Sequence, residues 1–280
     1  MFNILYMETQ YLNLLHTLLT TGERRSTRSG TVYSSFGHVL SCDISKHFPL
    51  LTTKKMYFKG IVEELAWFLR GSTDVQELRD KKVHIWDGNT ENRNYDAGPV
   101  YGFQWRHFGA PYTSCKADYS GKGQDQIKRI LDLIRNDPSS RRILLSAWNP
   151  QQQHEMALPP CHVSYQFYVD CENKLHCQMY QRSADVFLGL PFNIASTALL
   201  MHLIAHETDR KVGTLRMVIG DAHLYEEHAG VASKQVKRVP HEPPTLSIER
   251  EQDGLWGLKR SEIRLENYKY HGALKAKMAV

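Results

Sequence analysis

One cysteine of this chain lies in a setting that suits a nucleophile. Cys161 follows two prolines in the segment ALPPCHVSYQ, and His162 comes directly after it. The prolines hold the backbone extended, so we expect the thiol at a stiff entrance to a strand. A cysteine reacts as its thiolate, which needs positive charge or hydrogen-bond donors nearby. The ordinary alternative is a buried structural thiol. We keep that interpretation for the other cysteines, Cys42, Cys115, Cys171 and Cys177.

A second group of polar side chains follows a predicted strand. The segment QRSADVFLGLPFN (181–193) places Arg182, Ser183, Asp185 and Asn193 among apolar residues, directly before a predicted buried helix. A loop carboxylate is the ordinary interpretation of Asp185, and a helix cap is that of Asn193, because Asn is a preferred cap residue. So many polar groups beside apolar ones favour a ligand pocket with fixed polar anchors.

Three further groups are weaker signals. Glu64 lies on the apolar stripe of a predicted helix, where burial would raise the pKa of a carboxyl group toward the range useful for proton transfer. Spacing alone still favours an edge residue that reaches solvent. Arg141 and Arg142 suit a phosphate dianion, and equally a surface pair. His223 and Tyr225 stand two apart in GDAHLY, where they could both reach a hydroxyl or form an exposed loop pair.

Periodicity predicts the elements that must position these groups. Apolar spacing predicts helices over 8–21, 57–70 and 125–135, with Gly22 ending the first, and a buried helix over 194–206. Strands are predicted over 143–148, 163–169, 175–182 and 215–220, the first of them buried and the middle two joined as a hairpin. Because helices and hairpins mix without a regular βαβ alternation, we expect an α+β domain on a largely antiparallel or mixed sheet.

Length and composition limit the classes of protein. The 280 residues suit one large domain, 1–280, with polar surface insertions at 88–98 and 110–124. No apolar run reaches the roughly 18 residues of a membrane span. No secretion signal is apparent, so we expect free thiols and a cytoplasmic or nuclear location. The basic residues behind the net charge of +5 are scattered, which argues against a nucleic-acid partner, and no zinc-ligand spacing is present.

The motifs of the chain resemble those of the thymidylate synthase family over nearly its whole length. They occur in the family's order, which makes the resemblance specific. The matching segments are FPLLTTKK (48–55), EELAWFLRGST (63–73), IWD (85–87), GPVYGFQWRHFGA (98–110), SSRRILLSAWNP (139–150), ALPPCH (157–162), YQFYV (165–169), QRSADVFLGLPFNIAS (181–196), GDAHLY (220–225) and KMAV (277–280). The resemblance implies a twisted mixed sheet with surrounding helices, a homodimer joined sheet to sheet, and a C-terminal lid over 268–280.

The resemblance also implies a reaction. A one-carbon unit passes from 5,10-methylenetetrahydrofolate to C5 of dUMP, and the products are dTMP and dihydrofolate. Cys161 attacks C6 of the uracil ring, which makes C5 a nucleophile. A base network removes the C5 proton, and the folate then returns a hydride.

Each matching position has an implied role. The positions implied to bind dUMP are Arg28, Arg182 and Ser183 at the phosphate, Arg141 and Arg142 at the same phosphate from a partner subunit, Asn193 at the pyrimidine edge, His223 and Tyr225 at the ribose, and Gln181. The implied catalytic set is Cys161, Glu64, His162, Tyr101, Asn193 and Asp185. The implied folate contacts are Trp86, Asp185, Leu188, Gly189 and Phe192, with Lys54 near the glutamate tail and Val280 closing over both ligands. No metal is implied.

Three segments depart from the family pattern. The stretch TRSGTV (27–32), which holds Arg28, is one residue shorter than the family's phosphate loop. YKYHGALK (268–275) lacks the family's proline, so we expect a looser hinge for the lid. Thr197 stands where a tyrosine is usual, and we have no functional interpretation of that change.

Other functions fit parts of the pattern. A dUMP 5-hydroxymethylase would share the pocket and use water in place of hydride. A deoxycytidylate hydroxymethylase would carry an acidic residue at position 193, where this chain has Asn193. An idle homologue could bind RNA through its basic surface, but the retained pocket set argues against it. The synthase is therefore the main hypothesis.

Overall fold

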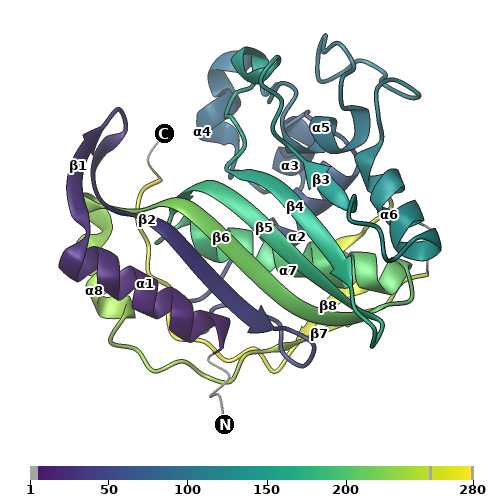
Figure 1. The fold of residues 1–280 in the computed structure, drawn as a ribbon. Helices are drawn as coiled ribbons and strands as arrows, with labels where there is room; N and C mark the ends of the chain where they lie inside the picture. Colours follow the sequence, from purple (N-terminus) through teal and green to yellow (C-terminus); the bar gives the residue numbers. More distant parts are fainter. Residues whose placement is uncertain (1–5, 252–253, 279–280) are drawn as a thin grey trace.

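The computed structural model describes residues 6–251 and 254–278, and a six-stranded sheet forms its centre (Figure 1). The strand order is β1-β2-β6-β5-β4-β3. Their bounds are β1 Glu23–Thr27, β2 Gly30–Asp43, β3 Leu144–Ser146, β4 His162–Val169, β5 Lys174–Asp185 and β6 Lys211–Tyr225. Neighbours pair antiparallel except β5 and β6, which pair in parallel. The predicted α+β class with a mixed sheet is therefore confirmed.

Helices cover one face of this sheet. The longer ones are α1 (Met7–Thr21), α2 (Phe58–Leu69), α6 (Gln126–Asn136) and α7 (Gly189–Glu207). The shorter ones are α3 (Gln76–Asp80), α4 (Asp87–Thr90), α5 (Tyr101–His107) and α8 (Ala229–Gln235). A separate hairpin pairs β7 (Thr245–Ile248) with β8 (Ile263–Glu266). Helices α2 and α7 lie behind the sheet in Figure 1, and one apolar core extends from α1 to β8.

The predicted helices form, and one of them begins earlier than predicted. Gly22 is the C-cap of α1, as predicted, with an extended backbone at φ −62° and ψ 136°. Gly71 after α2 does have a positive φ, 75°, which glycine adopts without a steric cost. The predicted buried helix over 194–206 begins earlier, at Gly189.

Two of the predicted strands differ from expectation. The strand over 143–148 was expected to be buried, but β3 is the last strand of the sheet and its side chains alternate: Leu145 is buried and Leu144 is 47% exposed. The strand predicted over 215–220 is longer at both ends, because β6 runs from Lys211 to Tyr225. His223 and Tyr225 therefore lie within a strand, and their interpretation as a loop pair is wrong.

The two polar insertions are only partly exposed. In 88–98, Thr90 and Ala97 are fully buried. In 110–124, Ala110 and Tyr119 are buried against Phe103 in a small apolar cluster separate from the main core. Apolar residues within each polar segment thus fix it to the domain.

No helix in the described part of the chain is long and apolar enough to cross a membrane. The cytoplasmic or nuclear location remains a prediction.

A buried carboxylate fastens α1 to the segment that carries Lys54. Glu8 is 4% exposed and accepts the backbone N–H groups and both hydroxyls of Thr52 and Thr53, at 2.6–2.9 Å. The carbonyl of Thr52 in turn accepts the N–H of His271 at 2.7 Å. Glu8 therefore supports both the segment before α2 and the C-terminal segment.

We expect Glu8→Ala to lower the free energy of unfolding by about 3 kcal/mol, because it leaves buried donors without their charged acceptor. Urea denaturation at fixed protein concentration measures the change. The control Glu23→Ala, on the fully exposed strand β1, should change it by less than about 0.5 kcal/mol. An equal effect of both substitutions would contradict the role of Glu8.

Candidate active site

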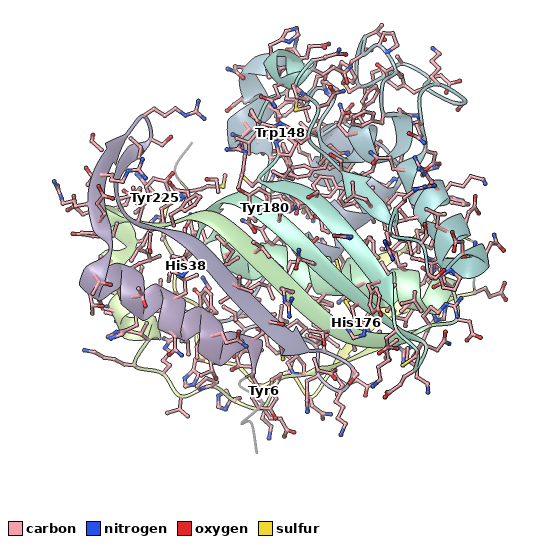
Figure 2. The ribbon with its side chains drawn as sticks, viewed as in Figure 1. Tyr6, His38, Trp148, His176, Tyr180 and Tyr225 are labelled. Carbon is pink, nitrogen blue, oxygen red and sulfur yellow. The ribbon has the colours of Figure 1, made fainter. Side chains whose placement is uncertain are left out.

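The ends of three strands bring the polar motifs together. Cys161 directly precedes β4, and its carbonyl accepts the N–H of Arg182 in β5 at 2.9 Å. β5 and β6 end together, with Asp185 paired to His223. Because β4 runs antiparallel to β5, its first residue lies beside the last residues of β5 and β6. Trp148 and Tyr225 mark this end of the sheet in Figure 2.

Arg182 holds the segment before Cys161 in place. Its Nε donates to the carbonyl of Pro160 and one Nη donates to that of Pro159, both at 2.9 Å. The guanidinium also lies 5.4 Å from the ring centre of Trp148. The rigid PPC backbone expected from the sequence is therefore fixed by an arginine as well as by its prolines.

Opposing effects act on the pKa of the Cys161 thiol. Burial raises the pKa of Cys161, whereas the charge of Arg182 and a hydrogen bond with Tyr101 lower it. The hydroxyl of Tyr101 also accepts the backbone N–H of Cys161 at 2.7 Å. Arg182 and Tyr101 are therefore the groups that favour the reactive thiolate.

The surroundings of His162 favour its neutral form. Its ring lies 5.0 Å from that of Tyr101, and its Nδ1 is 3.0 Å from the hydroxyl of Tyr165. Burial lowers the pKa of His162 to about 4, although a hydrogen bond with Asn193 opposes this. The ring is therefore uncharged at neutral pH and can take part in a proton relay. Thr197, the residue that departs from the family pattern, donates to the carbonyl of Asn193 at 2.7 Å.

Glu64 has the environment of a proton-transfer group. The indole Nε1 of Trp86 donates to its carboxylate at 2.8 Å. Burial raises the pKa of Glu64 to about 7, although the hydrogen bond from Trp86 opposes the rise. The neighbouring Glu63 is the carboxylate that reaches a surface cation, the ammonium of Lys81 at 2.6 Å. Glu64 is thus half-buried and held by Trp86 rather than extended freely into solvent.

Asn193 lies inside α7, which begins at Gly189, so the helix-cap interpretation is wrong. Its Oδ1 accepts a hydrogen bond from Nε2 of Gln181 at 2.8 Å, and the same Nε2 donates to the carbonyl of Ser183 at 3.0 Å. Gln181 is 1% exposed, and its buried Oε1 has no hydrogen-bond partner among the described residues. An unpartnered buried acceptor at this position is typical of a site that a ligand or its water completes.

Asp185 sets the start of α7. Its Oδ1 accepts the N–H groups of Phe187 and Leu188, both at 3.0 Å. Lys54 lies on the same side: its ammonium donates to the carbonyl of Phe187 and sits 4.0 Å from the centre of that ring. Burial lowers the pKa of Lys54 to about 8, and Asp185 opposes the shift. Lys54 is therefore a buried neighbour of Asp185, and its contact with a glutamate tail remains a prediction.

His223 and Tyr225 point from β6 into the same region. Their rings are 5.5 Å apart and nearly perpendicular. Burial raises the pKa of Tyr225, while Ser29 and the charge of Arg28 lower it, so the tip of the β1–β2 hairpin lies close to Tyr225. The tip is a two-residue turn, because Thr27 pairs with Gly30. The shortened loop thus still brings Arg28 toward the site.

Two of the predicted phosphate ligands lie elsewhere. Arg141 and Arg142 are exposed and precede β3, whose Leu144 pairs with Gln166 well along β4. At about 3.3 Å per strand residue, this places them roughly 20 Å from the first residue of β4. They cannot complete the site of their own chain. Val280 lies outside the described residues.

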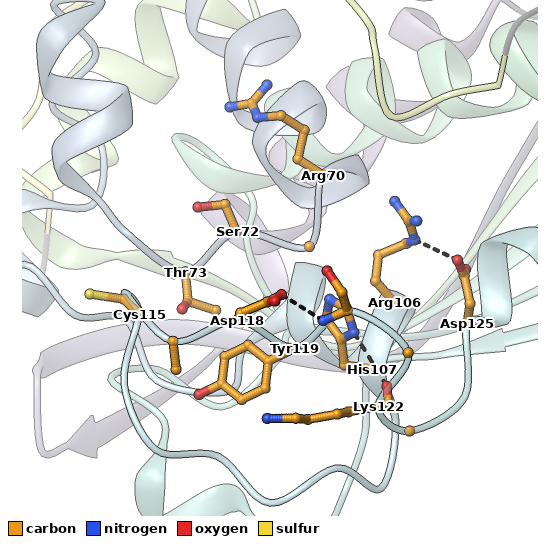
Figure 3. Close-up of a pocket in the computed structure, with 15 residues that line it drawn as sticks. Arg70, Ser72, Thr73, Arg106, His107, Cys115, Asp118, Tyr119, Lys122 and Asp125 are labelled. Carbon is orange, nitrogen blue, oxygen red and sulfur yellow. Dashed lines mark hydrogen bonds and ion pairs between the residues drawn. The ribbon is translucent and has the colours of Figure 1, made fainter.

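A cavity of about 590 Å³ opens away from these residues, between the ends of α2 and α5 and the insertion 110–124 (Figure 3). Its charged side chains are largely paired: Arg106 binds Asp125 at 2.9 Å, and Arg70 binds Glu77 at 2.8 Å. Arg70 and Lys122 lie on opposite sides of the view and do not converge. We therefore assign the chemistry to the Cys161 end of the sheet. Among the described residues, no three His, Cys, Asp or Glu side chains cluster as metal ligands.

Two contacts of the site involve residues that were given no role from the sequence, although both lie in matched segments. The hydroxyl of Tyr165 is hydrogen-bonded to His162, and alternation along β4 marks Tyr165 as inward-facing. Trp148, which lies under Arg182, follows the edge strand β3.

Comparison with known proteins agrees with this geometry. The family model described as thymidylate synthase matches residues 9–280. The chain is 47% identical to thymidylate synthase of Herpesvirus ateles, over 99% of each protein. It is also 47% identical to the bifunctional dihydrofolate reductase-thymidylate synthase of Zea mays and 46% to that of Leishmania major. In both alignments it covers 98% of itself, and it spans 54% and 55% of these bifunctional relatives.

The matched motifs, the mixed sheet and the convergent side chains around Cys161 all lie within the region covered by the family model. The chain belongs to the thymidylate synthase family.

Proposed function

We propose that this chain converts dUMP and 5,10-methylenetetrahydrofolate to dTMP and dihydrofolate. The observation that carries the proposal is the setting of Cys161, whose thiolate is favoured by Arg182 and Tyr101 at the strand ends where Asn193 also lies. The relative from Herpesvirus ateles, which matches over its full length, supports the same activity.

Cys161 starts the reaction by adding its thiolate to C6 of uracil, and the electrons of the C5–C6 bond move to C5 and the C4 carbonyl. C5 can then bond to an electrophilic carbon. We assign the pyrimidine edge to Asn193, and the hydrogen bond from Gln181, which fixes the direction of its amide, supports this assignment. Arg28, Arg182 and Ser183 bind the phosphate, and His223 and Tyr225 the ribose, as the resemblance implies.

Glu64 and His162 serve the proton transfers. With a pKa of about 7, Glu64 can exchange a proton at neutral pH. His162, neutral because of burial, and Tyr101 extend this network toward the ring. The C5 proton leaves through this network by way of water before the methyl group forms.

The residues present fit a folate. Oδ1 of Asp185 accepts two backbone N–H groups, which within the described chain leaves Oδ2 for the N–H donors of a pterin ring. Leu188, Gly189 and Phe192 lie at the start of the same helix, and the indole of Trp86 lies beside Glu64. The bound folate supplies the one-carbon unit and then a hydride. The closed site must exclude water so that hydride transfer is faster than the addition of water. If water adds instead, the product is 5-hydroxymethyl-dUMP and the enzyme is a 5-hydroxymethylase.

The product distinguishes these activities. We expect dTMP by mass spectrometry, with dihydrofolate formed in equal amount. We expect Cys161→Ser to lower kcat by at least about a thousandfold while dUMP still binds, because the covalent step is lost. The control Cys171→Ser, at an exposed thiol, should retain full activity. Dominant 5-hydroxymethyl-dUMP would replace the synthase proposal, and a Cys161→Ser variant above a tenth of the wild-type rate would exclude this nucleophile.

We expect Glu64→Gln to lower kcat about a hundredfold, the usual size of a lost acid–base group, while Glu63→Gln has little effect. The wild-type rate should rise with pH through a midpoint near 7, because the basic form of Glu64 appears there. Trp86→Phe should move this midpoint upward, since the Trp86 hydrogen bond favours the carboxylate. Steady-state pH profiles decide this, and an unmoved midpoint would show that another group titrates.

We further propose a homodimer joined through the open face of the sheet. Val39, Val218, Tyr180 and Ser164 pair across four strands and so point to one side. Val39 is 56% exposed and Tyr180 is 40% exposed on this face. No helix covers the β3–β6 part of it in the view of Figure 1. A second copy on this face would bring its own Arg141 and Arg142 to the phosphate.

Mixing two inactive variants tests this arrangement. We expect Cys161→Ala and Arg142→Glu to recover about a quarter of the wild-type rate on subunit exchange. Half of the dimers are then mixed, and each mixed dimer has one intact site of two. Native mass spectrometry confirms the exchange. Complete exchange without recovered activity would show that each chain forms its own site.

A further inference from the structure

We propose that His228 is a positioning residue that holds the C-terminal segment, here residues 272–278, against the active site. This inference deepens the proposed function and rests on it for its kinetic consequences. His228 ends the short helical turn Glu226–His228 that follows β6, and it is 1% exposed. His228 is not one of the motif residues named above.

The hydrogen bond of His228 has a defined direction. Its Nε2 lies 2.7 Å from the backbone carbonyl of Lys277, which can only accept, so Nε2 carries the proton. Among the described residues, the nearest carboxylate oxygen that pairs with Nε2 belongs to the exposed Glu227, 3.7 Å away and beyond hydrogen-bonding distance. The imidazole therefore donates to the last part of the described chain.

The same ring contacts groups on both sides of the proposed site. It lies 5.5 Å from the ring of Tyr225, on the ribose side, and 5.7 Å from the ring of Phe187, on the folate side. The carbonyl of Phe187 accepts the ammonium of Lys54. His228 thus joins the C-terminal segment to residues that face each of the two ligands.

Simple packing does not explain a histidine here. The Nδ1 of His228 is buried without a hydrogen-bond partner among the described residues. An unpaired buried acceptor is unfavourable, and an aliphatic side chain would fill the space without that cost. The donor at Nε2 is what an aliphatic side chain could not supply.

The start of the segment is anchored separately. His271 donates its N–H to the carbonyl of Thr52 at 2.7 Å, a bond that a proline at this position could not make. Arg238 donates to the carbonyl of Gly272 at 2.8 Å. The hinge that lacks proline is therefore held by hydrogen bonds, and the bond from His228 acts farther along, at Lys277.

Limited trypsin digestion of the full chain tests the contact without any assumption about activity. Cleavage after Lys275 or Lys277 removes residues 276–280 or 278–280, which intact-mass measurement detects. We expect His228→Leu to speed this cleavage about 3- to 10-fold, the effect of losing one buried hydrogen bond. His228→Gln, whose amide can donate from a position close to that of Nε2, should restore most of the protection. Glu227→Gln, in the same turn, should leave the rate unchanged.

Thermal unfolding of each variant verifies that the domain is folded. Unchanged cleavage in folded His228→Leu, or equal acceleration in His228→Leu and His228→Gln, would overturn the proposal. If neither variant protein folds, His228→Asn is digested in their place, because its side chain is too short for the amide to reach Lys277. Its cleavage should be as fast as that expected for His228→Leu. Cleavage of His228→Asn at the wild-type rate would overturn the proposal.

Steady-state kinetics then connect the contact to catalysis. We expect His228→Leu to raise KM for the folate about 3- to 10-fold and His228→Gln to restore it, with KM for dUMP changed less than about twofold. Faster tail cleavage with an unchanged KM for the folate would overturn the link to the active site. Absence of dTMP formation in the wild-type chain would instead contradict the proposed function, and the digestion result would stand.

Discussion

The active site depends on the contact between Arg182 and the two prolines before Cys161. Extended proline segments expose carbonyls that need donors, and the guanidinium of Arg182 satisfies both at 2.9 Å. This contact joins the end of β5 to the start of β4. It also brings a positive charge to the thiol, so one side chain both holds the backbone before Cys161 and lowers the pKa of its thiol.

Burial is the common cause of the unusual protonation states around that thiol. It raises the pKa of Glu64 to about 7, lowers that of His162 to about 4 and lowers that of Lys54 to about 8. Each group is closer to its neutral form than it would be in water, because the charged form is poorly solvated inside the domain. Of these three groups, Glu64 has the pKa nearest to neutral pH.

The two faces of the sheet differ in what covers them. Its inner face packs on α2 and α7, which carry Glu64 and Asn193, while the outer face of β3–β6 keeps Tyr180 and Val39 exposed. Arg141 and Arg142 lie on the edge of the same sheet, far from the strand ends that hold Cys161. A partner on the outer face would cover Tyr180 and Val39 and would lie beside the edge that carries Arg141 and Arg142.

The sequence by itself determined the helices near 8–21 and 57–70, the β4–β5 hairpin and the segments that carry the chemistry, because periodicity and motif order are local properties of the chain. Only the tertiary structure decided that Trp86 binds Glu64 while Lys81 binds Glu63, that Asn193 lies inside a helix, and that His228 reaches Lys277. Burial and strand register are set by segments far apart in sequence, so spacing along the chain cannot reveal them.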